Sequence, residues 1–155
     1  MALHTTTVLT MVNAPAERVR IALADYRELR PAILSSHFTG YQVIEGGQGA
    51  GSTVRWTLNP ARWGTGQARE WLVRVEEVDG ALVESDTHSP AVTTWTVTEA
   101  ANGRSAVKVL LTCEVPGGLR GAMARIRASN LRKVYGEVVW KLYEHFAADR
   151  GAAGR

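Results

Sequence analysis

The sequence predicts an α+β domain in which an antiparallel sheet packs against one long C-terminal helix. Between residues 5 and 115 the chain repeats short segments rich in Val, Thr and Trp, separated by turn residues, which is typical of strands. Asp79-Gly80 is a strong hairpin signal, and Asn102-Gly103 is expected to join the last two strands. After Gly118 the apolar residues change to helical spacing. Strands grouped ahead of a terminal helix favour an antiparallel sheet.

The N-terminal part predicts one strand followed by two short helices. Thr5 to Val12 is rich in Thr and Val, as strands are. Asn13 is a good N-cap residue and Pro15 stands where a first helical turn tolerates proline, so a helix is expected over residues 14–24. A second short helix, capped by Asp25, is expected to run through Leu29.

Six further strands are expected between the short helices and the long one. Their alternation of apolar and polar residues places Val54, Trp56 and Leu58 on one face of one strand. It places Trp71 and Val73 on the inward face of the next strand. The expected strands cover residues 38–45, 52–58, 67–78, 81–87, 91–99 and 105–115.

The long helix is predicted from one drifting apolar stripe that ends near Ala148. A helix of about 30 residues is roughly 45 Å long, so it is expected to lie across the sheet. A twisted sheet curled around such a helix leaves a wedge that side chains fill or a ligand occupies. We expect a single domain over residues 1–148 and a flexible tail over residues 149–155. The stripe consists of Leu119, Met123, Ile126, Asn130, Val134, Val138, Leu142 and Phe146.

Composition excludes several classes of protein. The 155 residues suit one domain, and 45% hydrophobic with 21% charged residues excludes an intrinsically disordered chain. No apolar run is long enough for a transmembrane segment and no signal peptide is evident, so a cytoplasmic location is predicted. The single cysteine, Cys113, excludes an internal disulfide and a structural zinc site. The glycine-rich stretch 46–51 lacks the ending of a phosphate-binding loop, and we predict neither a cofactor nor a metal.

The net charge of +3 is unevenly distributed. Residues 1–103 carry 8 basic and 11 acidic side chains, whereas residues 104–155 carry 10 basic and 4 acidic ones. A basic C-terminal helix could meet an acidic partner or nucleic acid, but a solvated outer face is the simpler interpretation. We therefore expect no nucleic-acid partner.

Three segments resemble the START/polyketide cyclase superfamily (SRPBCC), in particular its bacterial single-domain members of the polyketide cyclase/dehydrase type. The segments are Val12-Asn13-Ala14-Pro15-Ala16-Glu17-Arg18-Val19, Gly51-Ser52-Thr53-Val54-Arg55-Trp56 and Gln67-Ala68-Arg69-Glu70-Trp71-Leu72-Val73-Arg74-Val75. The resemblance implies a helix-grip fold, in which a curved antiparallel sheet of seven strands surrounds the C-terminal helix. It also implies a cavity between sheet and helix that binds a hydrophobic small molecule such as a lipid, isoprenoid or polyketide.

Within that cavity we expect apolar walls and a few polar groups that orient the ligand. Each group has a simpler explanation: the tryptophans can be core, and Arg69 can form an internal or rim ion pair with Glu84. Asn130 interrupts the apolar stripe, where a buried amide needs partners, from a ligand or from the sheet backbone. The expected walls are Trp56, Trp71, Trp95 and Met123, with Trp63 closing one end, and the expected polar groups are Arg69, His88 and Asn130.

Two other functions compete with ligand binding. The first is an enzyme, a cyclase, aromatase or dehydratase, which uses acid–base groups in the same cavity. Its candidates are Asp86 and His88, because Glu84, Asp86 and His88 alternate onto one face of the strand over 81–87. A polar run of this kind is more often the solvent face of an antiparallel strand. The second is an interaction module that uses the basic C-terminal helix. The sequence determines neither the ligand nor the oligomeric state.

Overall fold

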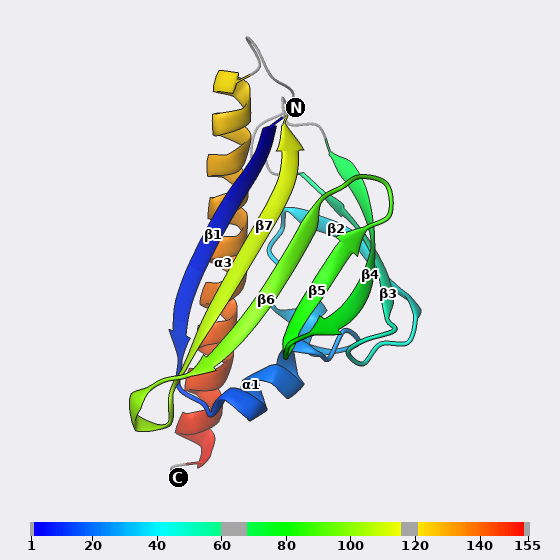
Figure 1. Cartoon of the computed structure of the whole chain (residues 1–155). Coiled ribbons are helices and arrows are strands. Elements are labelled where there is room, and N and C mark those ends of the chain that lie inside the picture. The colour runs from blue at the N-terminus through cyan, green and yellow to red at the C-terminus, as the bar shows by residue number, and fades with distance from the viewer. Residues whose placement is uncertain (1, 60–67, 116–120, 154–155) are drawn as a thin grey trace.

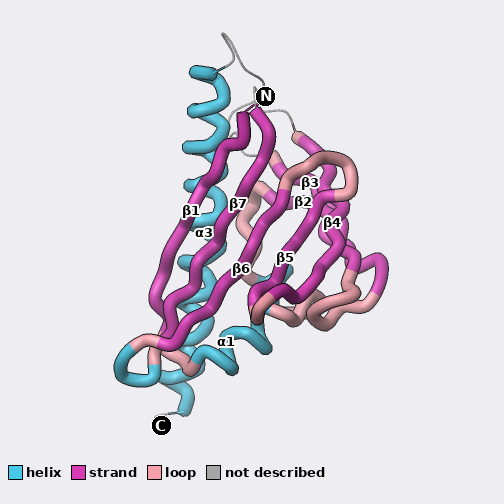
Figure 2. The backbone as a smooth tube through the Cα atoms, in the orientation of Figure 1, coloured by secondary structure: helices cyan, strands magenta, loops and turns pink. Residues whose placement is uncertain are grey.

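The fold was obtained as a computed structural model, which describes residues 2–59, 68–115 and 121–153. Side chains are described for residues 3–59, 68–113 and 129–148. Seven strands form one antiparallel sheet in the order β1-β7-β6-β5-β4-β3-β2, and the long helix α3 runs along it (Figures 1 and 2). The predicted helix-grip fold is thereby confirmed. The elements are β1 (Ala2–Val12), α1 (Ala16–Leu23), α2 (Leu29–Ala32), β2 (Phe38–Glu45), β3 (Thr53–Leu58), β4 (Arg69–Val78), β5 (Ala81–Asp86), β6 (Val92–Glu99), β7 (Ser105–Val115) and α3 (Gly121–Ala153).

The two hairpin turns predicted from the sequence form as expected. Asp79 and Gly80 both have positive φ, 50° and 81°, between β4 and β5. Asn102 and Gly103 have φ of 63° and 68° between β6 and β7. Because Gly and Asn tolerate this left-handed backbone, and Asp does so better than most residues, these dipeptides allow tight antiparallel connections.

The second short helix differs from its prediction. The Asp25 carboxylate does act as a cap, because its Oδ1 accepts hydrogen bonds from the backbone N–H of Arg27 and Glu28, at 3.1 Å each. However, this turn is not continued as a helix, and α2 begins only at Leu29. The first helix likewise starts at Ala16 with Pro15 as its N-cap, so Asn13 does not serve that role.

The core lies between the concave face of the sheet and α3. The predicted inward residues of β3 and β4 are buried, and so are the described apolar members of the helix stripe from Val134 to Phe146. Helix α3 runs beside β1 at one edge of the sheet and continues to Ala153, so residues 149–153 of the predicted flexible tail are helical (Figure 1). Among the described residues, no helix has both the length and the apolar character that a membrane span needs.

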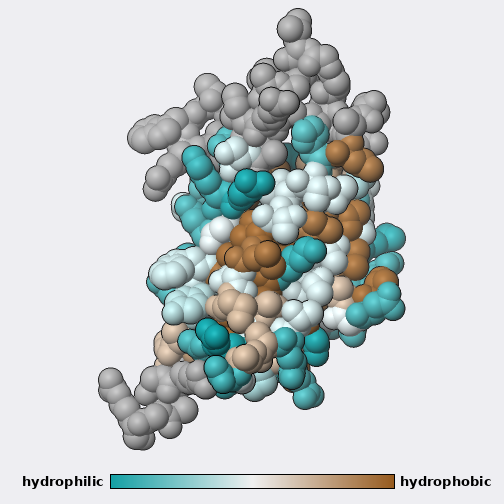
Figure 3. Space-filling model, turned by 60° about the vertical axis from the view of Figure 1, so that its left-hand side comes forward, coloured by the Kyte–Doolittle hydropathy of each residue, from teal (hydrophilic) through white to brown (hydrophobic). Residues whose placement is uncertain are grey.

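The surface carries a mixture of residue types. On the face shown in Figure 3, hydrophobic side chains gather near the middle and along one side, bordered by hydrophilic ones. The most exposed large apolar residues of β1 are Leu3 and Leu9. The large aromatic side chains of β3, β4 and β6 are instead turned inward.

Candidate functional site

The concave face of β2, β3 and β4 carries three nearly parallel aromatic rings. Trp56 lies directly opposite Trp71 in the antiparallel register of β3 and β4, which brings their side chains together. Their ring centroids are 6.5 Å apart with an interplanar angle of 15°, and Tyr41 of β2 stacks on Trp56 at 6.3 Å and 10°. The sheet register therefore builds one aromatic wall of the interior.

Tyr135 of α3 connects this interior to the helix. Its ring makes edge contacts with Phe38 at 6.1 Å and with Trp95 of β6 at 6.2 Å. The helix thus meets the β2 and β6 parts of the sheet through the edges of aromatic side chains. Burial raises the pKa of Tyr135 above its ordinary value, so its hydroxyl stays protonated.

A buried ion pair lies at the centre of the same interior. Arg30 of α2 places Nη2 2.8 Å from Oε2 of Glu84 on β5, and the exposed fractions of the two side chains are 6% and 1%. The hydroxyl of Tyr26 donates to Oε2 at 2.6 Å, and Nε1 of Trp95 donates to Oε1 at 2.8 Å. Both oxygens of Glu84 are therefore engaged.

The environment of this pair fixes its protonation. Burial alone would lower the pKa of Arg30, but the adjacent Glu84 carboxylate raises it above its ordinary value. The guanidinium also lies over the rings of Trp95 and Tyr26, at 4.4 and 4.7 Å. Burial, and then the charge of Glu84, raises the pKa of Tyr26, so that its hydroxyl acts as a donor.

A small cavity of about 10 Å³ lies among these groups, which is room for about one water molecule. Trp56 lines it and is 5% exposed, and its Nε1–H has no hydrogen-bond acceptor among the described residues. The full lining is Tyr26, Arg30, Leu34, Phe38, Tyr41, Trp56, Glu84, Trp95, Tyr135 and Val138.

A second charge pair joins β4 to β5. Nη1 of Arg69 lies 2.7 Å from Oδ2 of Asp86, which also accepts a hydrogen bond from the Ser89 hydroxyl at 2.7 Å. The Asp86 side chain is fully buried, and the Arg69 guanidinium packs 3.8 Å above the Trp71 ring. Although burial raises the pKa of Asp86, the hydrogen bonds from Arg69, Ser89 and the Leu72 N–H lower it below its ordinary value.

Three of the sequence-predicted tryptophans lie in this interior. Trp56, Trp71 and Trp95 are buried and inward, and Asn130 is half-buried on α3. Arg69 forms an ion pair, which is the simpler of the two roles considered for it, but its partner is Asp86 instead of Glu84. Trp63 lies outside the described residues, and Met123 lies on α3 where side chains are not described.

His88 does not share the inward face of β5. The strand ends at Asp86, and His88 lies exposed in the bend that follows, so the expected alternation stops one step earlier. Glu84 and Asp86 do point inward, together with Leu82, which means that this polar run is not a solvent face. The inward acid–base pair of Asp86 and His88 is therefore not formed.

Sequence reasoning missed the residues that surround Glu84. Neither Arg30 nor Tyr26 is among the candidate site residues predicted from the sequence. The sequence did contain one signal: Leu82, Glu84 and Asp86 alternate along one short strand and therefore share a face, which is buried. Carboxylates on a buried face need hydrogen-bond donors that also point into the interior. The sequence spacing does not show which donors are near, since 54 residues separate Arg30 from Glu84.

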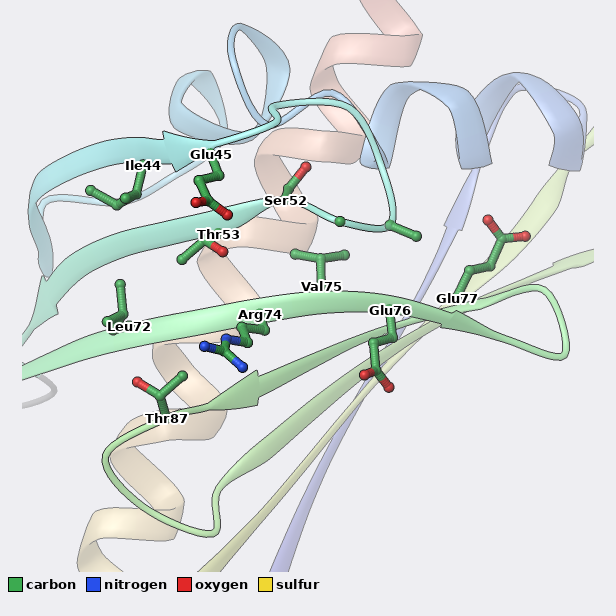
Figure 4. A pocket seen from close by; sticks show the side chains of 12 residues that line it. Ile44, Glu45, Ser52, Thr53, Leu72, Arg74, Val75, Glu76, Glu77 and Thr87 are labelled. Atoms are coloured by element: carbon green, nitrogen blue, oxygen red, sulfur yellow. The ribbon is translucent and has the colours of Figure 1, made fainter.

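A broader hollow of about 710 Å³ opens elsewhere, between the end of β2 and the strands β3 and β4 (Figure 4). The charged residues that line this hollow are Glu45, Arg74, Glu76 and Glu77, and all four side chains are exposed. Because the charged groups of this hollow are hydrated, they give little selectivity for a ligand. Among the described residues, no group of three or more His, Cys, Asp or Glu side chains is placed to hold a metal ion.

The comparisons with known proteins agree with this architecture. The profile of the family described as polyketide cyclase/dehydrase and lipid transport matches residues 4–146. The solution structure of the KanY protein is 34% identical, with a TM-score of 0.84 over 95% of this chain and 99% of that chain.

Two more distant structures share the fold. A START superfamily protein from Mycobacterium smegmatis is 13% identical, with a TM-score of 0.69 over 92% of this chain and 98% of that chain. The Zhui aromatase/cyclase from a Streptomyces species is 15% identical, with a TM-score of 0.64 over 99% and 97%. No curated protein matches the sequence.

Proposed function

The chain belongs to the polyketide cyclase/dehydrase and lipid transport family, and from this premise we propose that it binds a hydrophobic small molecule between the sheet and α3. The observation that carries the proposal is the aromatic interior. Rings from β2, β3, β4, β6 and α3 face one another around a buried polar centre. Aromatic rings around a few fixed polar groups are the usual lining of a small-molecule site.

Ligand entry requires the interior to enlarge, because a cavity of about 10 Å³ holds no organic molecule. The contacts that Tyr135 makes with Phe38 and Trp95 are edge contacts between side chains. Such contacts are worth about 0.5–1.5 kcal/mol each beyond the buried area. Rotating Phe38 or Tyr135 breaks no backbone hydrogen bond of the sheet, and burying a ligand ring of similar size compensates for the lost contact.

The described interior favours binding over acid–base catalysis. Burial raises the pKa values of Tyr26, Tyr41 and Tyr135, so none of these hydroxyls is a base near neutral pH. Asp86 accepts hydrogen bonds from Arg69, Ser89 and the Leu72 N–H, and is thus committed to structure. A cyclase, aromatase or dehydratase of this fold would need a group with a pKa nearer neutrality.

The experiment is to purify the protein from its own host and to compare its native mass with its denatured mass. We expect an excess mass that denaturation releases and that an organic solvent extracts. Val138→Phe, which adds a ring to the cavity wall, should abolish the excess while the far-ultraviolet circular dichroism stays unchanged. Trp140→Phe is the matched control, because Trp140 is 57% exposed. A bare wild-type mass, together with no uptake of added hydrophobic ligands, would contradict the proposal.

A further inference from the structure

The indole N–H of Trp56 is a buried donor without an acceptor. The side chain is 5% exposed, and Nε1 finds no hydrogen-bond partner among the described residues. An indole N–H can only donate, and buried donors in proteins are almost always paired. Since Trp56 also lines the interior cavity, the cavity is where an acceptor for this N–H can be supplied.

The neighbouring oxygens are already engaged. Oε1 of Glu84 accepts from Trp95, and Oε2 accepts from Arg30 and Tyr26. The Tyr41 hydroxyl donates to the backbone carbonyl of Tyr26 at 2.6 Å. The Glu84 carboxylate and the hydroxyls of Tyr26 and Tyr41 therefore all have partners, whereas the Trp56 N–H has none among the described residues.

The charges around the interior also cancel. Arg30 is paired with Glu84, and Arg69 is paired with Asp86. A ligand carboxylate or phosphate would lose its hydration on entry and would meet the negative Glu84 without a free cation to replace the lost water. The described interior therefore disfavours anions.

From these observations we propose that the site selects an uncharged aromatic ligand whose ketone or quinone oxygen accepts a hydrogen bond from Trp56. The inference rests on the proposed function and specifies its ligand. The oxygen occupies the position that one water molecule fits, and the rings of the ligand pack against those of Phe38, Trp95 and Tyr135. A fatty acid or a phosphorylated isoprenoid is excluded by the same argument.

Three probes with one skeleton test the proposal: 2-acetylnaphthalene, 2-ethylnaphthalene and 2-naphthoate, each titrated by calorimetry near pH 7.5. We expect the ketone to bind about five- to tenfold more tightly than the hydrocarbon, which is the factor expected for one neutral hydrogen bond. The carboxylate should bind at least about 100-fold more weakly than the ketone. Equal affinities for ketone and hydrocarbon, or tightest binding of the carboxylate, would overturn the inference while leaving ligand binding intact.

Trp56→Phe removes the donor and keeps a ring. The ketone should lose about five- to tenfold in affinity, whereas the hydrocarbon should change by less than about twofold. Trp140→Phe, an exposed tryptophan, is the control and should change neither affinity. Ketone affinity that is unchanged in Trp56→Phe overturns the proposal.

A measurement on the wild-type protein covers the case in which Trp56→Phe does not fold. Nitrogen-15 spectra resolve the indole N–H signals, and that of Trp56 should move downfield with the ketone and stay in place with 2-ethylnaphthalene. A Trp56 signal that responds equally to both probes refutes the hydrogen bond. If none of the three probes binds while the native mass still shows an extractable molecule, the inference is wrong and the proposed function stands; if the native mass is bare as well, both fail.

Discussion

Arg30 and Glu84 form an ion pair that joins α2 to the middle strand of the sheet, with Nη2 and Oε2 2.8 Å apart and both side chains nearly fully buried. Burying two charges costs solvation energy that only good geometry and further hydrogen bonds offset. Here Tyr26 and Trp95 supply those hydrogen bonds to the carboxylate, and the Leu23 carbonyl accepts one from Arg30 at 3.2 Å. The pair thus fixes how the short helices dock over the interior.

Removing one charge of this pair should be strongly destabilising. We expect Glu84→Gln to lower the free energy of unfolding by about 3–5 kcal/mol, because Arg30 remains buried without its counter-charge. The double variant Arg30→Met/Glu84→Gln should recover part of that loss. Urea unfolding followed by circular dichroism measures both, and Glu76→Gln on the exposed face of β4 is the control. Strictly additive effects of the two substitutions would mean that the pair is not coupled.

Stability at acid pH should depend on Asp86. Its pKa in the folded protein lies below the ordinary value of 3.8, so its contribution to stability is complete above about pH 5 and is lost as pH falls through the lower folded-state pKa. The free energy of unfolding should fall between about pH 5 and pH 2 more steeply in the wild type than in Asp86→Asn. Urea titrations at each pH test this.

Asp79→Asn in the exposed hairpin turn is the matched control for this titration. It should keep the wild-type pH dependence, since the Asp79 side chain lies outside the buried pair. Parallel curves for Asp86→Asn and the wild type would show that Asp86 has no shifted pKa.

Alternating sequence patterns were sufficient to predict the sheet but not the polar centre of the site. Trp56, Trp71 and Trp95 each lie two residues from an apolar residue of the same strand. Because alternate residues of a strand share a face, their inward direction follows from strand geometry. The positive-φ turns and the helical stripe are equally local signals. These features determine the strand order only together with the resemblance to a known family.

The sequence did not assign the partners of Glu84 and Asp86 correctly: it paired Arg69 with Glu84 instead of Asp86, and the true partner of Glu84, Arg30, lies 54 residues away along the chain. Both carboxylates break the rule that inward positions are apolar, and the hypothesis of a solvent face followed from that rule. Their partners are Arg30, from a four-residue helix, and Arg69, at the start of β4. His88 was placed on the same face because nothing in the sequence marks Asp86 as the last residue of β5.

Truncating Phe38 should open the interior at its contact with Tyr135. We expect Phe38→Ala to lower the free energy of unfolding by about 3–5 kcal/mol and to increase the affinity for 2-acetylnaphthalene, because the ligand ring fills the space of the lost one. Phe146→Ala is the matched control, since Phe146 is also a buried phenylalanine but does not line the cavity. Calorimetry and urea unfolding measure the two effects. Similar ligand affinities in both variants would place the binding site elsewhere.

Binding of an uncharged ligand should be almost independent of salt. Because Arg30 and Arg69 are each paired internally, binding of an uncharged ligand displaces no counterions. Salt therefore has almost no charge interaction between protein and ligand to screen. The affinity for 2-acetylnaphthalene should change by less than about twofold between roughly 50 and 500 mM sodium chloride. An acidic partner or nucleic acid held by the basic C-terminal helix would instead dissociate steeply over this range. Titrations at the two salt concentrations separate the two functions, and a large loss of ketone affinity at high salt would show that charged surface groups, not the interior, bind the probe.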